Sequence, residues 1–238
     1  MTMSYPDFRP ASTRATNQSA LAVGVHSPEF PIQTRRRGFY RNIVKRALDV
    51  SAILLAAPVV VPMVAGLALM IRRDGGMSFY TQQRVGKDGR HFKMWKLRSM
   101  VSDADARMEA YLAANPEARR EWDETQKLKR DPRITPFGRF LRRSSLDELP
   151  QLWNVLIGDM SLVGPRPMML NQQDLYPGTA YYALRPGITG HWQTAGRNQT
   201  SFEARAEYDT DYEKQVSLAT DAKILLRTVS VVMKCTGY

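Results

Sequence analysis

The strongest constraint on the fold is a run of 22 residues without a charge, from Val50 to Ile71. At ~1.5 Å per residue, a straight helix of this length would just cross the apolar core of a bilayer. Pro58 and Pro62 lie in the middle of the run, and each proline removes a backbone donor and clashes with the preceding helical turn. The run therefore predicts a membrane-embedded helix that breaks near its centre.

Positive charge flanks both ends of this run. The basic residues are Arg35, Arg36, Arg37, Arg41, Lys45 and Arg46 before it, and Arg72, Arg73, Arg84, Lys87, Arg90, Lys93, Lys96 and Arg98 after it. A helix that spans the bilayer would place one of these clusters on the outer side, against the tendency of cations to remain inside. A re-entrant hairpin satisfies both observations, because both of its ends emerge on one face. A full span and a buried helix of a soluble protein are the alternatives.

Composition narrows the class of partner. The chain has 238 residues and a formal net charge of +11, which favours an anionic partner such as nucleic acid, an acidic membrane surface or a phosphorylated substrate. Cys235 is the single cysteine, so an internal disulfide is excluded. The sequence contains no Cys/His cluster with the spacing of a structural zinc site.

The chain divides into three segments by composition. Residues 1–38 are rich in proline and poor in apolar periodicity, which predicts a disordered tail. Residues 39–74 are the expected membrane segment, and residues 75–238 are expected to form one folded domain, which is the candidate for any catalytic function. The expected elements of that domain are strands at 78–82 and 91–96, helices at 102–129 with an interruption near 115–116, at 137–143, 201–214 and 218–234, and a loop at 185–190. The expected class is thus α/β, mostly α: a membrane-associated monotopic protein with a proline-broken re-entrant helix, a small β-hairpin and several amphipathic helices.

Two adjacent carboxylates, Asp147 and Glu148, are expected to open a short apolar helix. Ser145-Leu146-Asp147-Glu148 fits a capping box, with Ser145 as the N-cap and Glu148 as its N3 partner. The same carboxylates, kept ionised at a helix N-terminus, suit a Mg²⁺ ligand or a nucleophile that attacks phosphorus. The two interpretations are compatible, and the residues alone favour the capping box.

Arg166 stands between two prolines in Gly164-Pro165-Arg166-Pro167. Proline on both sides keeps the local chain extended, and a guanidinium fixed in this way suits bidentate binding of phosphate. A surface arginine in a rigid loop explains the pattern equally well. The further arginine candidates, near the acids or on glycine-rich loops, are Arg139, Arg142, Arg143, Arg185 and Arg197.

Several motifs occur in a fixed order along the chain. They are Gln83-Arg84-Val85-Gly86, Lys96-Leu97-Arg98-Ser99-Met100, Leu146-Asp147-Glu148-Leu149-Pro150-Gln151, Val163-Gly164-Pro165-Arg166-Pro167, Arg185-Pro186-Gly187-Ile188-Thr189-Gly190 and Gly196-Arg197-Asn198. With the basic segment and the proline-broken run before them, they make the chain resemble the bacterial sugar transferases over roughly residues 40–238. These are monotopic polyprenyl-phosphate phosphoglycosyl transferases, and the resemblance is greatest to the short members that initiate exopolysaccharide synthesis. Members of the family often carry Ser-Pro at the helix break, where this chain has Ala57-Pro58.

The resemblance implies a reaction in which a UDP-sugar, with galactose or glucose as the sugar, and undecaprenyl phosphate give undecaprenyl diphosphate sugar and UMP. Asp147 would be the nucleophile, and Glu148 would complete the acid pair and help Asp147 to hold Mg²⁺, with Mn²⁺ as an alternative. The residues implied to bind phosphates or the nucleotide are Lys96, Arg142, Arg166 and Arg197.

The resemblance also implies a location and partners. The chain would lie on phospholipid of the bacterial inner membrane, with its catalytic domain on the cytoplasmic face. Later glycosyltransferases of the same pathway and an oligomeric assembly are open as further partners, and nucleic acid is not expected.

A different class of function is compatible with the charge. A basic membrane-tethered interaction protein, or a scaffold without catalysis, would bind acidic lipid or nucleic acid with strong salt dependence and show no Mg²⁺-dependent activity. That alternative leaves the ordered acid, glycine and proline motifs without an explanation.

Overall fold

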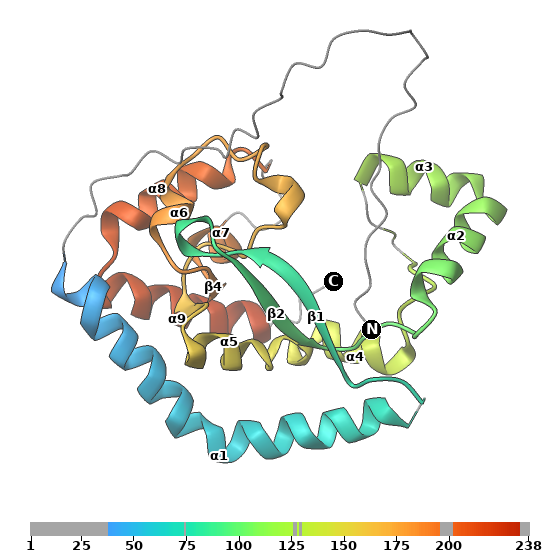
Figure 1. Ribbon diagram of the computed structural model, residues 1–238, viewed down its shortest axis with the longest axis horizontal. Coiled ribbons are helices and arrows are strands. Elements are labelled where there is room, and N and C mark those ends of the chain that lie inside the picture. The colour runs from blue at the N-terminus through green and yellow to red at the C-terminus, as the bar shows by residue number, and fades with distance from the viewer. Residues whose placement is uncertain (1–37, 74, 126–127, 129, 196–201, 234–238) are drawn as a thin grey trace, which may run out of the picture. The chain divides into compact units, whose positions relative to one another are not determined.

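The computed structural model describes residues 38–73, 75–125, 128, 130–195 and 202–233 (Figure 1). The predicted disordered tail therefore lies outside the described residues except for Gly38. The helices are α1 (Lys45–Arg72), α2 (Ala104–Ala114), α3 (Pro116–Thr125), α4 (Pro136–Arg143), α5 (Gln151–Ile157), α6 (Ala180–Ala183), α7 (His191–Ala195), α8 (Arg205–Gln215) and α9 (Leu218–Met233), and the strands are β1 (Phe79–Val85), β2 (His91–Leu97), β3 (Ser161–Val163) and β4 (Gly187–Thr189).

The apolar run forms α1, which follows a π-helical turn at Tyr40–Val44. The helix continues through Pro58 and Pro62, so the predicted break is not an interruption of the helix. Its axis instead changes direction partway along, as Figure 1 shows for the blue and cyan ribbon. A bend is the expected result of a proline that lacks its donor and crowds the preceding turn. The return of the chain to the same leaflet stays a prediction.

α1 contacts the rest of the molecule near both of its ends. Near the first end, Lys45, Asp49 and Ile53 are buried at four-residue spacing, which places them on one face of the helix. Near the last end, Ile71 is 5% exposed. Between these contacts most apolar side chains are exposed, Leu55 to 85% of its surface. With the π-helical turn before it, the helix runs over 33 residues from Tyr40 to Arg72, and it is long and apolar enough to cross a membrane.

Buried polar contacts attach the first turns of α1. The Lys45 Nζ lies 2.6 Å from Asp221 Oδ2 on α9, and the Tyr212 hydroxyl donates to Asp221 Oδ1 at 2.6 Å. The Ser161 hydroxyl donates to Asp49 Oδ2 at 2.7 Å. A charge buried beside its partner is strongly destabilised when that partner is removed, so these contacts fix where α1 leaves the domain.

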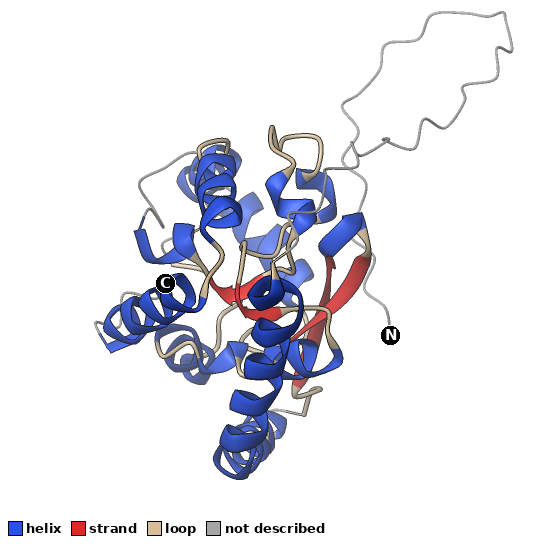
Figure 2. Cartoon of the chain, turned by 90° about the vertical axis from the view of Figure 1, so that its left-hand side faces the viewer, coloured by secondary structure: helices blue, strands red, loops and turns tan. Residues whose placement is uncertain are grey.

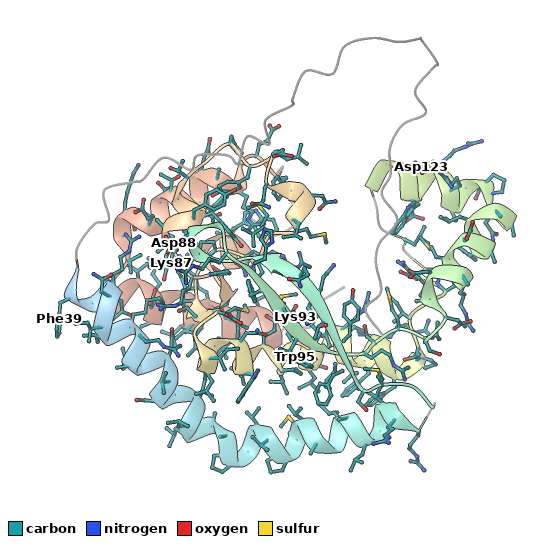
Figure 3. The ribbon with its side chains drawn as sticks, viewed as in Figure 1. Phe39, Lys87, Asp88, Lys93, Trp95 and Asp123 are labelled. Carbon is teal, nitrogen blue, oxygen red and sulfur yellow. The ribbon has the colours of Figure 1, made fainter. Side chains whose placement is uncertain are left out.

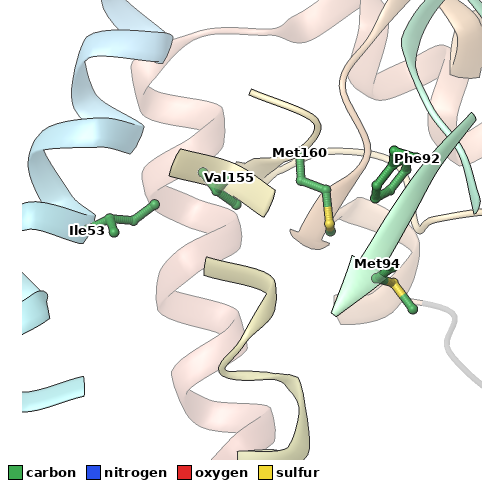
Figure 4. Packing of buried hydrophobic residues seen from close by; sticks show 5 residues of the cluster. All are labelled: Ile53, Phe92, Met94, Val155 and Met160. Atoms are coloured by element: carbon green, nitrogen blue, oxygen red, sulfur yellow. The ribbon is translucent and has the colours of Figure 1, made fainter. Parts of the chain in front are cut away.

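The two predicted strands are confirmed as an antiparallel hairpin. β1 pairs with β2 from Phe79↔Leu97 to Val85↔His91. Lys87 and Asp88 lie at the turn, and Lys93 and Trp95 lie on β2 (Figure 3). The helices surround the strands in Figure 2. One core cluster joins α1, β2, α5 and the turn after α5 through Ile53, Phe92, Met94, Val155 and Met160 (Figure 4).

The helix predicted at 102–129 is confirmed with its interruption, as α2 and α3 on either side of Asn115. The loop predicted at 185–190 is partly wrong, because Gly187–Thr189 forms β4 and pairs in parallel with β3. A Cβ on Gly187 would clash with the backbone of Gly164, and a Cβ on Gly164 would clash with the Arg185 carbonyl. Two short strands brought together by such a close approach leave no periodic signal in the sequence.

Candidate active site

The acid pair lies in a single 3₁₀ turn, Leu146–Glu148, between α4 and α5. The predicted capping box is wrong. Ser145 has a left-handed backbone with φ of 57° and its side chain makes no capping hydrogen bond, while α5 begins six residues later at Gln151. A positive φ is uncommon for a residue with a Cβ, and it turns the chain sharply between α4 and the acid pair.

Asp147 is buried, with 8% of its surface exposed. Burial raises the pKa of its carboxyl group above the usual range, and the neighbouring charge of Glu148 raises it further. The positive charges of Lys96 and Arg142 act in the opposite direction and lower this pKa. The carboxylate is therefore poorly hydrated, but two cations from different elements favour its ionised form.

Glu148 is held by the hairpin. The Lys96 Nζ on β2 donates to Glu148 Oε1 at 2.8 Å, and both side chains keep 22% and 29% of their surface exposed. Sequence reasoning assigned Lys96 to phosphate binding. The structure pairs it with the acid pair, a position from which the same ammonium group can also face a phosphate that enters beside Asp147.

Arg142 is the second cation beside Asp147, and it is fixed by Ser99. Its Nε donates to the Ser99 hydroxyl at 2.8 Å. α4 can approach Ser99 because residue 138 is glycine, where a Cβ would clash with the Ser99 carbonyl. Burial lowers the pKa of Arg142, while Asp147 and Asp131 raise it. The hydrogen bond to Ser99 thus holds one edge of the guanidinium group in place, and the positive charge of Arg142 acts on Asp147.

The acid pair can supply two carboxylate ligands to a magnesium ion, but not a complete set of ligands. Within residues 38–73, 75–125, 128, 130–195 and 202–233, no group of three or more Asp, Glu, His or Cys side chains forms a metal cage. Mg²⁺ commonly binds one or two carboxylates, several waters and the phosphates of a substrate. Asp147 and Glu148 therefore fit Mg²⁺ only as part of a site that a phosphate compound completes.

Arg166 lies in a second cluster, separate from the acid pair. Its side chain is exposed, and its charge lowers the pKa of two other arginines, Arg84 and Arg205. An Arg205 amino group donates to the Arg166 carbonyl, and Arg84 Nη1 donates to the Pro167 carbonyl at 3.4 Å. The segment that sequence reasoning singled out is therefore held by two side chains from distant parts of the chain.

Comparison with known protein families matches the bacterial sugar transferase family over residues 40–235. This chain belongs to that family. A UDP-galactose-lipid carrier transferase of Erwinia amylovora is 47% identical over 198 residues, which are 82% of this chain. An undecaprenyl-phosphate galactose phosphotransferase of Salmonella typhimurium is 43% identical over 198 residues and again 82% of this chain. The exopolysaccharide production protein ExoY of Rhizobium meliloti is 40% identical over 199 residues, also 82% of this chain.

The lengths of these family members differ. The match covers 42% of the Erwinia and Salmonella proteins, so this chain spans less than half the length of those relatives. It covers 88% of ExoY. The apolar run, the acid pair and the Arg166 segment all fall within the residues that match the family.

The structure separates the predicted site residues of this sugar transferase into groups. Lys96, Arg142, Asp147 and Glu148 meet, Arg166 lies in the second cluster, and Arg197 lies outside the described residues. Among the other candidates, Arg139 and Arg143 are exposed, and Arg185 donates to the Gly158 carbonyl at 2.9 Å.

Sequence reasoning placed Arg84 only among the cations that flank the apolar run, and it assigned Arg205 no role. Arg84 stands in one of the ordered motifs and could have been noticed there. Arg205 begins a helix identified only by its periodicity, and its contacts are with residues distant in the sequence.

Proposed function

We propose that this protein transfers a sugar 1-phosphate from a UDP-sugar to undecaprenyl phosphate, giving undecaprenyl diphosphate sugar and UMP. This reaction would be the first step in building an exopolysaccharide repeat unit. The single observation that carries the proposal is the buried Asp147 carboxylate. It lies beside Glu148, and the positive charges of Lys96 and Arg142 favour its ionised form. The names of its relatives and the family match support the same reaction class.

The proposed chemistry is a double displacement at phosphorus. An Asp147 carboxylate oxygen forms a bond to the phosphorus that carries the sugar, and the bond from that phosphorus to the bridging oxygen breaks, so UMP leaves with the electron pair. A phosphate oxygen of the lipid then attacks the same phosphorus and displaces Asp147. Negative charge builds on the phosphoryl oxygens in both steps, and Lys96 and Arg142 are placed to stabilise it.

Asp147 and Glu148 would hold Mg²⁺ together with phosphate oxygens of the donor, and Mn²⁺ is an alternative occupant of such a site. The bound cation would offset the repulsion between an attacking carboxylate and a diphosphate. Lys96 keeps Glu148 in place through the 2.8 Å ion pair, so the second carboxylate stays beside the first before any substrate binds.

The proposed location is the inner membrane, with α1 as a re-entrant helix and the domain on the cytoplasmic side. The contacts of α1 support it, because residues near both of its ends pack on the same catalytic domain. Lys45 pairs with Asp221, while Ile71 packs with Leu97 and Leu141. A straight helix of 28 residues would separate its ends by about 42 Å. A tag at the N-terminus and a probe at residue 100 should report the same side of the membrane, and opposite sides would contradict the hairpin.

The proposed donor sugar is galactose or glucose. Two relatives carry galactose in their names, which supports galactose as the first sugar to test. The experiment is UMP release by the purified full chain with Mg²⁺, undecaprenyl phosphate and a panel of UDP-sugars. Continuous release that depends on both the lipid phosphate and Mg²⁺ is the expected result, and without the lipid the protein should release at most one UMP per molecule.

The matched variants are Asp147→Asn at the proposed nucleophile and Asp211→Asn at an exposed carboxylate on α8. The first should lose UMP release while remaining folded, and the second should keep it. No release by the wild-type protein with any donor, together with salt-dependent binding of nucleic acid, would favour the non-catalytic interaction protein instead.

A further inference from the structure

Ser99 follows β2 and lies against the face of α4 that carries Arg142. Its residue is 7% exposed. Gly138 and Arg142 are four residues apart on α4, so they lie one above the other on the same face of the helix. A Cβ on Gly138 would clash with the Ser99 carbonyl, and the Ser99 hydroxyl accepts from Arg142 Nε at 2.8 Å. Ser99 therefore contacts both the first and the last turn of α4 on this face.

Backbone contacts hold Ser99 itself in place. The Ser99 carbonyl accepts from the Thr135 N–H at 3.2 Å, and the Val101 N–H donates to the Arg133 carbonyl at 2.9 Å. Thr135 is also the N-cap of α4, because its hydroxyl accepts from the Gly138 N–H at 2.8 Å. The Ser99 hydroxyl is thus attached to the same segment that begins α4, and its position relative to the helix is set before any substrate binds.

The hydrogen bond to Ser99 leaves part of Arg142 available to a ligand. Among the residues that the structure describes, this bond is the only hydrogen bond that the Arg142 side chain makes. A guanidinium group carries donors on all of its nitrogens, and the bond to Ser99 uses Nε. The terminal nitrogens Nη1 and Nη2 remain, and together they can bind two oxygens of one phosphate.

Asp147 lies near Arg142 without forming an ion pair with it. Their charges act on each other, because Asp147 raises the pKa of Arg142 and Arg142 lowers the pKa of Asp147. Within the described part of the chain, however, Lys96 pairs with Glu148 and no ion pair joins Arg142 to Asp147. A carboxylate that accepts hydrogen bonds from a guanidinium group has its oxygens occupied, so it is a poorer nucleophile. The observed position of Arg142, close to Asp147 but unpaired with it, therefore favours attack on phosphorus.

We propose that Ser99 is a positioning residue for the phosphoryl transfer. By binding the Nε edge of Arg142, Ser99 keeps the guanidinium group from forming an ion pair with Asp147 and leaves Nη1 and Nη2 for oxygens of the donor phosphate. The inference rests on the proposed function, because it takes transfer of a sugar phosphate to Asp147 as the reaction. Ser99 acts only through Arg142: its hydroxyl group neither contacts the substrate nor moves a proton.

The kinetic test is UMP release by the full chain with Ser99→Ala. Without the acceptor the guanidinium group can pair with Asp147, so kcat should fall about tenfold while the KM for the UDP-sugar stays within about twofold of the wild type. Ser99→Thr keeps a hydroxyl acceptor and should retain most of kcat. Ser102→Ala, at an exposed serine just past the same motif, is the matched control and should leave both constants as they were. A wild-type kcat in Ser99→Ala, or an equal loss in Ser99→Thr, would overturn the inference.

A double-mutant cycle with Arg142→Met separates a role through Arg142 from a general loss of structure. Two residues that act through one contact give effects on kcat that do not add. Ser99→Ala should therefore lower kcat no further once Arg142→Met is present. A further loss in the double variant, equal to the loss that Ser99→Ala causes alone, would show that Ser99 acts by another route.

A measurement without turnover tests the inference apart from the proposed function. In arginine-labelled protein in nanodiscs, NMR identifies the Arg142 Nε–H signal by its loss in Arg142→Met. Its exchange with water should be slow in the wild type and about tenfold or more faster in Ser99→Ala. Asp147→Asn should change this signal in the Ser99→Ala background, where the two groups pair, and leave it unchanged when Ser99 is present. Equal exchange in the wild type and Ser99→Ala would overturn the inference. A wild type that shows the expected exchange but releases no UMP from any UDP-sugar would contradict the proposed function alone.

Discussion

The acid pair and the Arg166 cluster, which consists of Arg84, Arg166 and Arg205, both combine buried and partly exposed charges, but their charges are arranged differently. At the acid pair, two carboxylates, Asp147 and Glu148, face two cations, Lys96 and Arg142. In the Arg166 cluster, Arg84, Arg166 and Arg205 lie within range of one another's charges, and Arg205 pairs with Asp209, whose pKa burial raises to about 6. In the first region each carboxylate has a nearby cation, whereas in the second region the guanidinium groups outnumber the carboxylate that pairs with them. The comparison shows that a net charge of +11 points to a binding site only when the residues that carry the local excess of positive charge are known.

The largest effect on activity should come from replacing Asp147, the buried carboxylate of the acid pair. Asp147→Asn removes the proposed nucleophile and should lower turnover by about 10⁴-fold or more. Folding should be retained or improved, because burial raises the pKa of Asp147 and its ionised form therefore opposes folding at neutral pH. Thermal unfolding and UMP release, measured on the same preparation, test both statements. A variant that turns over normally, or that fails to fold, would contradict them.

Removal of Lys96, one of the two cations beside the acid pair, should lower activity and change its pH dependence. Lys96→Met should lower kcat by about 100-fold, as the loss of one charge-stabilising group commonly does. Lys96 lowers the pKa of Asp147, so its loss should raise that pKa and move the acid limb of the pH–kcat profile to higher pH. Lys93→Met, an exposed neighbour on β2, is the control. An acid limb at the same pH in Lys96→Met would show that Lys96 does not act on Asp147.

Removal of Arg205, the buried cation on α8 that belongs to the Arg166 cluster, should mainly affect stability. Arg205→Met leaves Asp209 buried without its partner and should destabilise the fold by about 3 kcal/mol. Denaturation in detergent measures the loss. Arg166→Gln changes an exposed side chain and should stay within about 0.5 kcal/mol of the wild type. Equal destabilisation by both variants would show that the burial of the arginine does not determine the loss of stability.

The smallest effect should come from the turn that precedes the acid pair. Ser145 has a φ of 57°, and glycine adopts this conformation without the clash of a Cβ. Ser145→Gly should therefore raise stability by about 1 kcal/mol and leave turnover nearly unchanged. Ser144→Gly is the opposite control, because Ser144 is right-handed and its hydroxyl bonds to the Phe140 carbonyl, so this change should lower stability. A stability gain from Ser144→Gly would show that φ is not the cause.

Local patterns predicted the parts of the fold that depend on neighbouring residues. The apolar run, the β1–β2 hairpin and the interruption between α2 and α3 follow from uncharged length, alternation around a glycine turn and a proline at residue 116. The predicted capping box is wrong because of the backbone conformation of one residue. Its residue types fit, but the left-handed Ser145 directs the chain into a 3₁₀ turn, and α5 starts only at Gln151.

Long-range contacts explain what the sequence could not predict. The bond from Arg84 to the Pro167 carbonyl joins residues 83 positions apart, and the bond from Arg205 to the Arg166 carbonyl joins residues 39 apart. The family resemblance named Arg142, Asp147 and Glu148 as site residues, and the structure brings their charges together, while their roles stay predictions. Lys96 was assigned to phosphate, and its ion pair with Glu148 follows only from the fold.

The most direct test of the central claim is the intact mass of the protein after it is mixed with UDP-galactose or UDP-glucose and Mg²⁺ in the absence of undecaprenyl phosphate. The wild type should gain the mass of one sugar phosphate and release UMP, and peptide mapping should place the added group on Asp147. Addition of undecaprenyl phosphate should then remove it. UMP release that requires the lipid from the first turnover, with no added mass on the protein, would contradict a covalent intermediate on Asp147.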